Sequence, residues 1–303
     1  MKIKIKVLSP VHIGSGKEIS PLEYVLEENK FIRINMDALF QSPEFSKFKD
    51  KFLNMAQSER YIKNILPLDL LLSCTLYQID ISKTTEKFNP IEVKEFIKSC
   101  GSVYIPGSSL KGSILSGLME EVLYKKNIKK FTNFENHLAE VLSEITGKYD
   151  RGKFAQYLIV RDSNFKKPEE SLELSLSKLI GAKTQNKLPI LYETLKINTE
   201  FETEIKTTDD CKFKEEEILS MADRFYREVY KKEKEYATGK IIILPEPPKD
   251  GYLLRLGQGS TAWATSFLIL SEKLKIFYKV QKPKTRKLIS GAISMGWVSI
   301  QII

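Results

Sequence analysis

The feature that most constrains the fold is the stretch YLLRLGQGSTAWATSFLIL at residues 252–270. It begins with a short apolar run, long enough for a strand, and continues through a turn that contains Gly257 and Gly259. The second apolar run has helical spacing, and Ser260 is available as the N-cap of that helix. Glycines let a backbone approach a ligand closely, and the free N–H groups at a helix start favour an anion. The stretch therefore predicts a strand, a glycine turn and a helix, either as an anion site or as a plain capped turn.

A second copy of this arrangement lies at residues 103–126. A short extended segment ends in a Pro-Gly turn, and an amphipathic helix follows, with Ser108 and Ser109 as candidate N-caps. Lys111 falls in the first turn, where the helix dipole disfavours a cation unless an anion is near. These residues indicate a phosphate site, and an ordinary helix start is the alternative.

The beginning of the chain predicts a strand followed by a third glycine turn. Residues 2–8 alternate lysine with apolar side chains. His12 follows, and Gly14, Ser15 and Gly16 predict a turn that could present N–H groups to a phosphate. This is not a P-loop, because the glycine spacing differs and the required Ser or Thr is missing.

The rest of the chain alternates predicted strands and helices. A hairpin is expected at 22–34 and a helical insertion at 44–66, whose aromatic stripe favours a core role. The other expected elements are strands at 157–163, 191–197, 201–206 and 295–300, a long helix at 213–236, and a lysine-rich connector at 127–155 with a mobile loop at 147–153. This order predicts an α+β fold with ferredoxin-like halves.

Composition and charge narrow the class of protein. The 303 residues are 42% apolar, which is typical of a globular chain, and no apolar run is long enough to span a membrane. The three cysteines have neither metal-site nor disulfide spacing, which favours the cytoplasm. The net charge is +9, and residues 273–287 contain seven basic residues and no acid. This tract is either a solvated face or a surface for a polyanion.

Candidate catalytic residues are few. There are two histidines: His12 could act as a general base beside its glycine turn, whereas His137 falls in an ordinary amphipathic helix and is expected to be structural. Asp162 has no evident carboxylate partner for two-metal chemistry, and we expect it to bond the local backbone. No zinc spacing or catalytic motif is present, so we expect no cofactor and no metal.

Six motifs occur in a fixed order along the chain. They are SPVHIG at 9–14, IPGSSLKG at 105–112, RDS at 161–163, RLGQGS at 255–260, PKTR at 283–286 and GWV at 296–298. This order resembles the RAMP superfamily of CRISPR proteins, and within it the family of fifth Csm subunits of type III-A effector complexes. The resemblance extends over nearly the whole chain.

The resemblance implies two ferredoxin-like (RRM-like) modules in tandem. The first would occupy residues 1–167 and carry a helical insertion around 40–100. The second would occupy 168–303 and carry the glycine-rich loop, which contacts RNA in that family.

The resemblance also implies a non-catalytic subunit that binds the 3′ region of the crRNA and supports crRNA maturation and antiviral defence. The implied partners are single-stranded RNA, other Csm subunits, chiefly the backbone RAMP subunit, and a recruited host nuclease, with no membrane. The alternative is a metal-independent RAMP endoribonuclease, with His12 as general base and Lys111 or Arg255 stabilising the departing phosphate.

The motifs and the resemblance together predict the RNA-binding residues. They are His12, Gly14, Ser15, Gly16, Ser108, Ser109, Lys111, Arg255, Gly257, Gln258, Gly259, Ser260, Lys284, Arg286 and Lys287. Most of them offer N–H groups, hydroxyls or cations, so we expect binding chiefly to the RNA backbone, with weak sequence preference.

Overall fold

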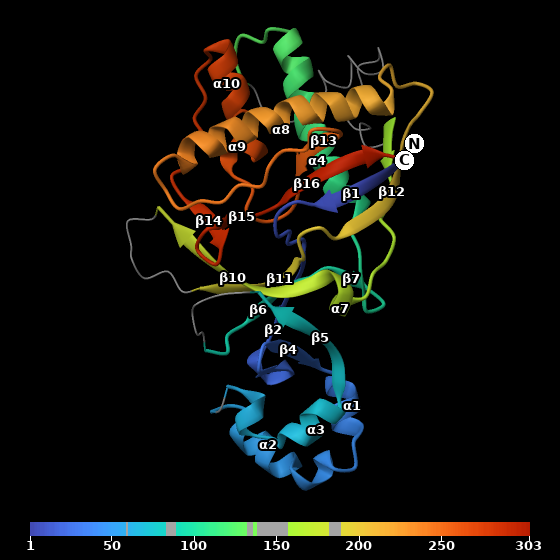
Figure 1. Cartoon of the computed structure of the whole chain (residues 1–303), viewed down its shortest axis with the longest axis vertical. Coiled ribbons are helices and arrows are strands. Elements are labelled where there is room, and N and C mark those ends of the chain that lie inside the picture. Colours follow the sequence, from blue (N-terminus) through green and yellow to red (C-terminus); the bar gives the residue numbers. More distant parts are fainter. Residues whose placement is uncertain (59, 83–88, 132–135, 138–156, 182–188) are drawn as a thin grey trace.

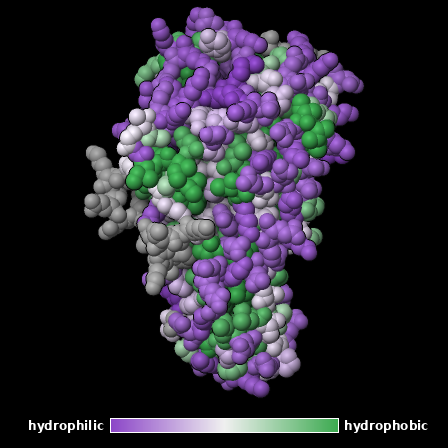
Figure 2. All heavy atoms as spheres, in the orientation of Figure 1, coloured by the Kyte–Doolittle hydropathy of each residue, from purple (hydrophilic) through white to green (hydrophobic). Residues whose placement is uncertain are grey.

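The structure is a computed structural model that describes every residue except 59, 83–88, 132–135, 138–156 and 182–188. Two sheets lie one below the other, helices cover the upper sheet, and a helical insertion forms the opposite end of the molecule (Figure 1). Hydrophilic side chains cover most of the upper end, where helices lie over the upper sheet, and apolar patches lie lower on the same face (Figure 2). The predicted α+β class is confirmed.

The upper sheet is antiparallel and has five strands. Their order is β13 (Tyr252–Arg255), β16 (Trp297–Ile302), β1 (Lys2–Val7), β12 (Glu200–Thr207) and β9 (Leu158–Val160). The strand predicted at the start of the chain from alternating lysine and apolar residues is confirmed as β1. Its apolar side chains are fully buried and its lysines are not. The first and last strands of the chain are therefore neighbours at the centre of this sheet.

Two long helices, α4 (Gly107–Lys125) and α8 (Glu215–Ala237), pack on each other and on the upper sheet (Figure 1). Their crossing is close: a Cβ added to Gly117 would lie 2.4 Å from Ala222 Cα. Both helices were predicted from their apolar spacing and both are confirmed. The helix predicted at 213–236 agrees with α8 within two residues at each end, whereas α4 begins before the predicted serine N-caps. Two shorter helices, α9 (Ala262–Thr265) and α10 (Leu268–Leu274), follow the glycine loop.

The lower sheet has nine strands. Its main path is β2 (Gly14–Ile19), β6 (Val93–Phe96), β11 (Ile190–Leu195), β10 (Leu172–Ile180), β5 (Thr75–Ile81), β4 (Lys30–Ile34) and β3 (Tyr24–Glu27). Beyond β5, the end of β10 pairs with β14 (Arg286–Ile289), which pairs with β15 (Ile293–Ser294). A small hairpin, β7 (Lys98–Ser99) with β8 (Ser102–Val103), leads into α4.

The helical insertion lies between β4 and β5 and has its own core. It contains α1 (Met36–Gln41), η2 (Phe45–Lys47), α2 (Lys49–Met55), η3 (Ile62–Asn64) and α3 (Leu68–Ser73). Phe45 is buried, and Phe48 and Phe52 pack against the same cluster, so the predicted core role of the aromatic stripe is confirmed. The insertion is shorter than the predicted 40–100, because the alternating residues after position 74 form β5.

Strands from either side of residue 168 are mixed in both sheets, so the predicted boundary does not separate one sheet from the other. As a division of the chain into units, 1–167 and 168–303 stays a prediction. The short helix α7 (Pro168–Ser171) begins at that point, and η1 (Pro21–Glu23) precedes β3. The predicted mobile loop at 147–153 lies outside the described residues, and so does most of the connector. No helix in the described part of the chain is long and apolar enough to cross a membrane.

Candidate nucleic-acid interface

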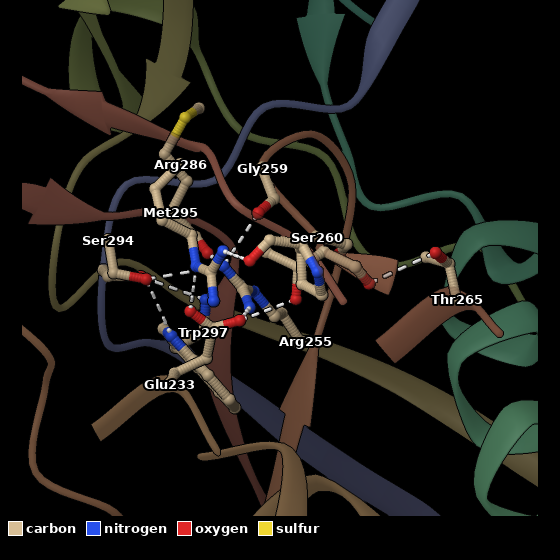
Figure 3. A network of polar contacts seen from close by, with 12 residues as sticks. Glu233, Arg255, Gly259, Ser260, Thr265, Arg286, Ser294, Met295 and Trp297 are labelled. Atoms are coloured by element: carbon tan, nitrogen blue, oxygen red, sulfur yellow. Dashed lines mark hydrogen bonds and ion pairs between the residues drawn. The ribbon is translucent and has the colours of Figure 1, made fainter. Parts of the chain in front are cut away.

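Three buried charged side chains meet behind the glycine loop. Glu233 comes from α8, Arg255 from the end of β13 and Arg286 from the start of β14 (Figure 3). Arg286 Nε donates to Glu233 Oε2 at 2.6 Å, and Arg255 Nη1 lies 3.4 Å from Glu233 Oε1. Thr261 Oγ1 also donates to Glu233 Oε1, at 2.6 Å. Each of the three charged residues is 3% exposed, so these charges depend on one another for the solvation that water no longer supplies.

Arg255 uses its other donors on the backbone around it. Its Nε donates to Met295 O at 3.0 Å, and its Nη2 donates to Gly259 O at 2.8 Å. The guanidinium carbon lies 4.7 Å from the centre of the Trp297 ring. Burial lowers the pKa of Arg255, and the neighbouring Glu233 opposes that shift. Arg255 thus ties the glycine loop to the segment that enters β16.

Arg286 is committed in a similar way. Its Nη1 donates to Pro283 O at 3.1 Å and to Thr285 O at 3.0 Å, and its guanidinium lies 3.8 Å from the centre of the Tyr236 ring. The prediction that Arg255 and Arg286 offer their charge to RNA at an exposed surface is therefore corrected. Both side chains are buried, and each one pairs with Glu233 and donates to backbone carbonyls.

The glycine loop forms the close-approach turn that its sequence predicts, but it approaches another part of the protein and not a ligand. Gly257 and Gly259 have φ of +67° and +88°, which other residues rarely adopt. A Cβ on Gly257 would lie 2.1 Å from His12 O, and one on Gly259 would lie 2.7 Å from Met295 Cβ. Gln258 N donates to His12 O at 2.8 Å. The close approach that requires these glycines is therefore made by the protein's own backbone, and Gly257 and Gln258 remain exposed on the outer side.

The helix after this loop begins later than predicted. Ser260 Oγ donates to Gly257 O at 3.2 Å and caps no helix. Thr261 occupies the N-cap position of α9, which is only four residues long. The continuous helix expected after Ser260 is wrong, because the chain leaves the helical conformation at Ser266 before α10 begins.

His12 is buried beneath the sheet surface at 3% exposure. Its Nδ1 lies 2.7 Å from Glu193 O, and its ring packs against Tyr192 and Phe96. Burial lowers the pKa of His12 to about 4, so the imidazole is neutral at pH 7. A direct RNA contact by this side chain, predicted from the sequence, is therefore corrected, and the endoribonuclease alternative loses the exposed base that it needs.

Residues 14–16 are part of strand β2 rather than a turn, which corrects the prediction. The strand pairs with β6, and the pairing is irregular between Gly14 and Glu18. Ser15 Oγ donates to Glu95 Oε2 at 2.8 Å on the neighbouring strand. Gly14 and Gly16 are exposed at this edge of the lower sheet.

The N-terminus of α4 is already satisfied by a carboxylate. Gly107 N donates to Asp162 Oδ1 at 2.7 Å, and Pro106 occupies the N-cap position. Ser108 and Ser109 therefore lie within the first turn and are not N-caps, contrary to the prediction. Asp162 supplies the negative charge that the helix dipole favours. Asp162 bonds the backbone as predicted, but the prediction of a local partner is wrong, because the partner is 55 residues away.

Two other predicted residues lie in packed surroundings. Lys111 is half-buried on α4, and burial lowers its pKa. His137 is 1% exposed, and its ring lies 5.9 Å from that of Phe131 and 5.5 Å from that of Phe267. The structural role expected of His137 is confirmed.

A basic groove of about 620 Å³ lies where the end of α8 meets the tract before β14. Lys240, Lys282 and Lys284 line it together with Gly181 and Tyr236. Lys240 Nζ lies 3.5 Å from the centre of the Tyr236 ring, and Tyr236 Oη donates to Lys284 O at 2.9 Å. The ring thus fixes the backbone of the groove and concentrates cations around it. Of the predicted RNA contacts, Lys284 is the one in this groove.

Lys287 points elsewhere, since its Nζ lies 3.4 Å from Tyr192 Oη beside His12. Sequence reasoning missed Glu233, Tyr236 and Lys240. A signal for Glu233 existed, because it continues the apolar face of the long helix, one turn after Val229, and a charge on such a face is buried and needs a partner. Nothing in the sequence links Lys240 to the basic tract at residues 273–287.

Among the residues that the structure describes, no group of three or more His, Cys, Asp or Glu side chains could hold a metal ion. What the site offers instead is an exposed glycine loop, a rigid charged cluster behind it and a cationic groove nearby. Cations, N–H groups and hydroxyls of this kind bind phosphate oxygens, which suits the backbone of a single-stranded nucleic acid.

Comparisons with known proteins agree with this description. The RAMP superfamily profile matches residues 4–262. The CRISPR system Cms protein Csm5 of Streptococcus thermophilus is 26% identical over 329 aligned positions, which cover 100% of this chain and 89% of that protein. The Csm5 of Methanocaldococcus jannaschii is 26% identical over 164 positions, which cover 50% of this chain and 37% of that protein.

Solved structures share the fold. A chain of the Csm–crRNA–target RNA ternary complex of a type III-A CRISPR-Cas system has a TM-score of 0.74 at 24% identity, with 99% of this chain and 100% of that chain covered. The crystal structure of T. onnurineus Csm5 has a TM-score of 0.72 at 22% identity, with 98% and 99% covered. The predicted ferredoxin-like RAMP architecture and the resemblance to the fifth Csm subunits are confirmed.

Proposed function

Because the chain belongs to the RAMP superfamily, we propose that it is the fifth subunit of a type III-A CRISPR (Csm) effector complex and binds the 3′ region of the crRNA. The observation that carries this proposal is the similarity to the Streptococcus thermophilus Csm5 over the whole of this chain. The backbone RAMP subunit is its proposed neighbour, and a host nuclease recruited for crRNA maturation is a further proposed partner. The proposed location is the cytoplasm.

The RNA is proposed to follow the basic groove and the outer side of the glycine loop. Lys240 and Lys284 supply positive charge along the groove, and Lys282, which also lines it, pairs with Glu272. Gln258 is exposed and Ser260 is half-exposed beside the loop. Arg255 and Arg286 act as positioning residues, because they hold the loop and the groove backbone from inside. The exposed edge at Gly14 and Gly16, and the surface at Ser108, Ser109, Lys111 and Lys287, remain proposed secondary contacts.

The proposed role is non-catalytic. The burial of His12 and Arg255 removes two of the groups that the endoribonuclease alternative uses. The test that separates the two functions is incubation of a labelled repeat RNA with the purified protein in EDTA. Cleavage that disappears in a His12→Ala variant would establish the enzyme and refute the proposal.

The RNA-binding site itself is tested by the dependence of affinity on salt. The variant is Lys240→Ala with Lys284→Ala, since both lysines line the groove and are exposed. Each lost phosphate contact should reduce the slope of log K against log salt by about 0.7, because fewer counterions are released from a single strand. The melting temperature should barely change, because exposed lysines contribute little to stability.

The matched control is Lys49→Ala with Lys51→Ala, which removes the same charge from helix α2 in the insertion, far from the groove (Figure 1). We expect this control to keep the wild-type slope. Equal slopes for wild type and the groove variant would show that the groove does not bind the RNA backbone.

A further inference from the structure

The segment before the basic groove alternates between exposed and packed side chains. Lys275, Phe277 and Lys279 are exposed. Leu274 and Tyr278 lie on the other side and pack against the two core clusters beneath α4 and α8. The segment follows the left-handed C-cap of α10 at Lys275 and exposes one aromatic ring between two cations.

The backbone on both sides of Phe277 is held in place. Ile276 N donates to Ser271 O at 3.0 Å at the end of α10. The Tyr278 ring lies 4.7 Å from the Phe131 ring. Because the backbone is held between two such anchors, little backbone ordering entropy is lost when the Phe277 side chain binds a ligand.

Phe277 is 81% exposed, although burying a Phe side chain normally contributes about 1.5–3 kcal/mol. Single exposed apolar residues are common, so exposure alone indicates little. Here, however, the ring has a lysine two residues away on each side, and residues 273–287 contain no acid. Among the described residues, its ring has none of the aromatic contacts that hold Tyr278. An open ring between cations is typical of surfaces that bind single-stranded nucleic acid.

We propose that Phe277 stacks on one base of a single-stranded RNA, and that Lys275 and Lys279 bind the phosphates on either side of that base. This inference rests on the proposed RNA-binding function and adds a base contact to a site otherwise made of backbone contacts. Lys282 of the groove is five residues further on, at most about 18 Å away along an extended chain, so one RNA strand reaches both in a few nucleotides. The surplus of lysine favours RNA over a protein partner, and stacking tolerates every base because each has an aromatic face.

The experiment measures binding of a 12-nucleotide oligoadenylate to the full-length protein and to Phe277→Ala and Phe277→Trp variants, over a salt series. Phe277→Ala should weaken binding by about 5- to 150-fold, as expected for the loss of one stacked base, with the salt slope unchanged. Phe277→Trp should bind at least as tightly as wild type, and its added fluorescence should be quenched by the oligonucleotide. Inorganic polyphosphate, which has the charge without the bases, should produce no such quenching. Phe165→Ala is the control for loss of an exposed ring elsewhere, and it should bind like wild type.

The possible failures are distinct. Wild type that binds no RNA, alone or in the assembled complex, would overturn both the proposed function and this inference. If wild type binds RNA and the folded Phe277→Ala variant binds it with equal affinity, the stacking role is overturned and the proposed function still stands. Unchanged RNA affinity together with poorer incorporation of Phe277→Ala into the complex would assign Phe277 to a protein neighbour instead.

Discussion

Replacing Glu233 by Gln should destabilise the fold by about 3–5 kcal/mol, the usual cost of removing one partner from a buried ion pair. The carboxylate accepts from Arg286 Nε and Thr261 Oγ1, both at 2.6 Å, and lies 3.4 Å from Arg255 Nη1. In the variant, both guanidinium groups would remain buried with no negative charge beside them. One nitrogen on each of them already lacks a hydrogen-bond acceptor among the described residues. The loss should therefore approach the upper end of that range.

The assay is urea unfolding at pH 7, followed by circular dichroism. The matched control is Glu235→Gln, which is the same change on the same helix at a side chain that is 69% exposed and pairs with Lys232 at 3.7 Å. Such surface pairs contribute at most about 1 kcal/mol, so this control should unfold close to wild type. A typical domain is stable by about 5–15 kcal/mol, so Glu233→Gln should leave a folded but clearly weakened protein.

The comparison between the two variants decides the matter. Equal unfolding free energies for Glu233→Gln and Glu235→Gln would refute the conclusion that the carboxylate stabilises the loop through the two arginines. High salt gives a second check, because a buried cluster is screened less than a surface pair. The deficit of Glu233→Gln relative to wild type should therefore persist in high salt.

Two further changes test the surroundings of the loop. Gly257→Ala should destabilise the protein by about 1–3 kcal/mol or more in the same urea assay, because Gly257 has a positive φ and the new Cβ would clash with His12 O. The control is Gly112→Ala on α4, where a Cβ meets no other atom, and it should stabilise the protein by about 0.5–1 kcal/mol. The pKa of His12 is lowered to about 4 in the fold. As the pH falls, the unfolded chain therefore takes up a proton at this side chain before the folded protein does. The free energy of unfolding should decrease by about 3 kcal/mol between about pH 6.5 and pH 4. Burial raises the pKa of Glu120 to about 7, which acts in the opposite direction, so the His12 contribution is the difference between wild type and His12→Asn at each pH.

The elements that could be predicted from sequence are those that local spacing determines. The apolar faces of α4 and α8 repeat with helical period, and the alternation in β1 marks a strand with one buried face, so neither needs information from elsewhere in the chain. The overall architecture was predicted from the resemblance to the RAMP superfamily, because the order of motifs along the chain is retained even where pairwise sequence identity is low.

The errors at the site share one cause: the partners are distant in sequence. Residues 14–19 form a strand because β6 lies about 75 residues further along the chain and offers an edge to pair with. Ser108 and Ser109 do not cap α4, because Asp162 already bonds its first turn. In both cases the local pattern was compatible with two structures, and a tertiary contact selected one of them.

The two arginines show why a motif can be functional without touching its ligand. Arg255 belongs to the loop motif and Arg286 to the basic tract, and their charges suggested direct contact with phosphate. In the structure both arginines pair with the same carboxylate, that of Glu233 on α8, which lies 53 residues before Arg286. An arginine that binds a phosphate contributes to the salt dependence of binding, whereas one that holds a loop changes affinity with the salt slope intact. We propose that the groove lysines belong to the first kind and the buried arginines to the second, so loss of affinity alone would not identify a residue that contacts RNA.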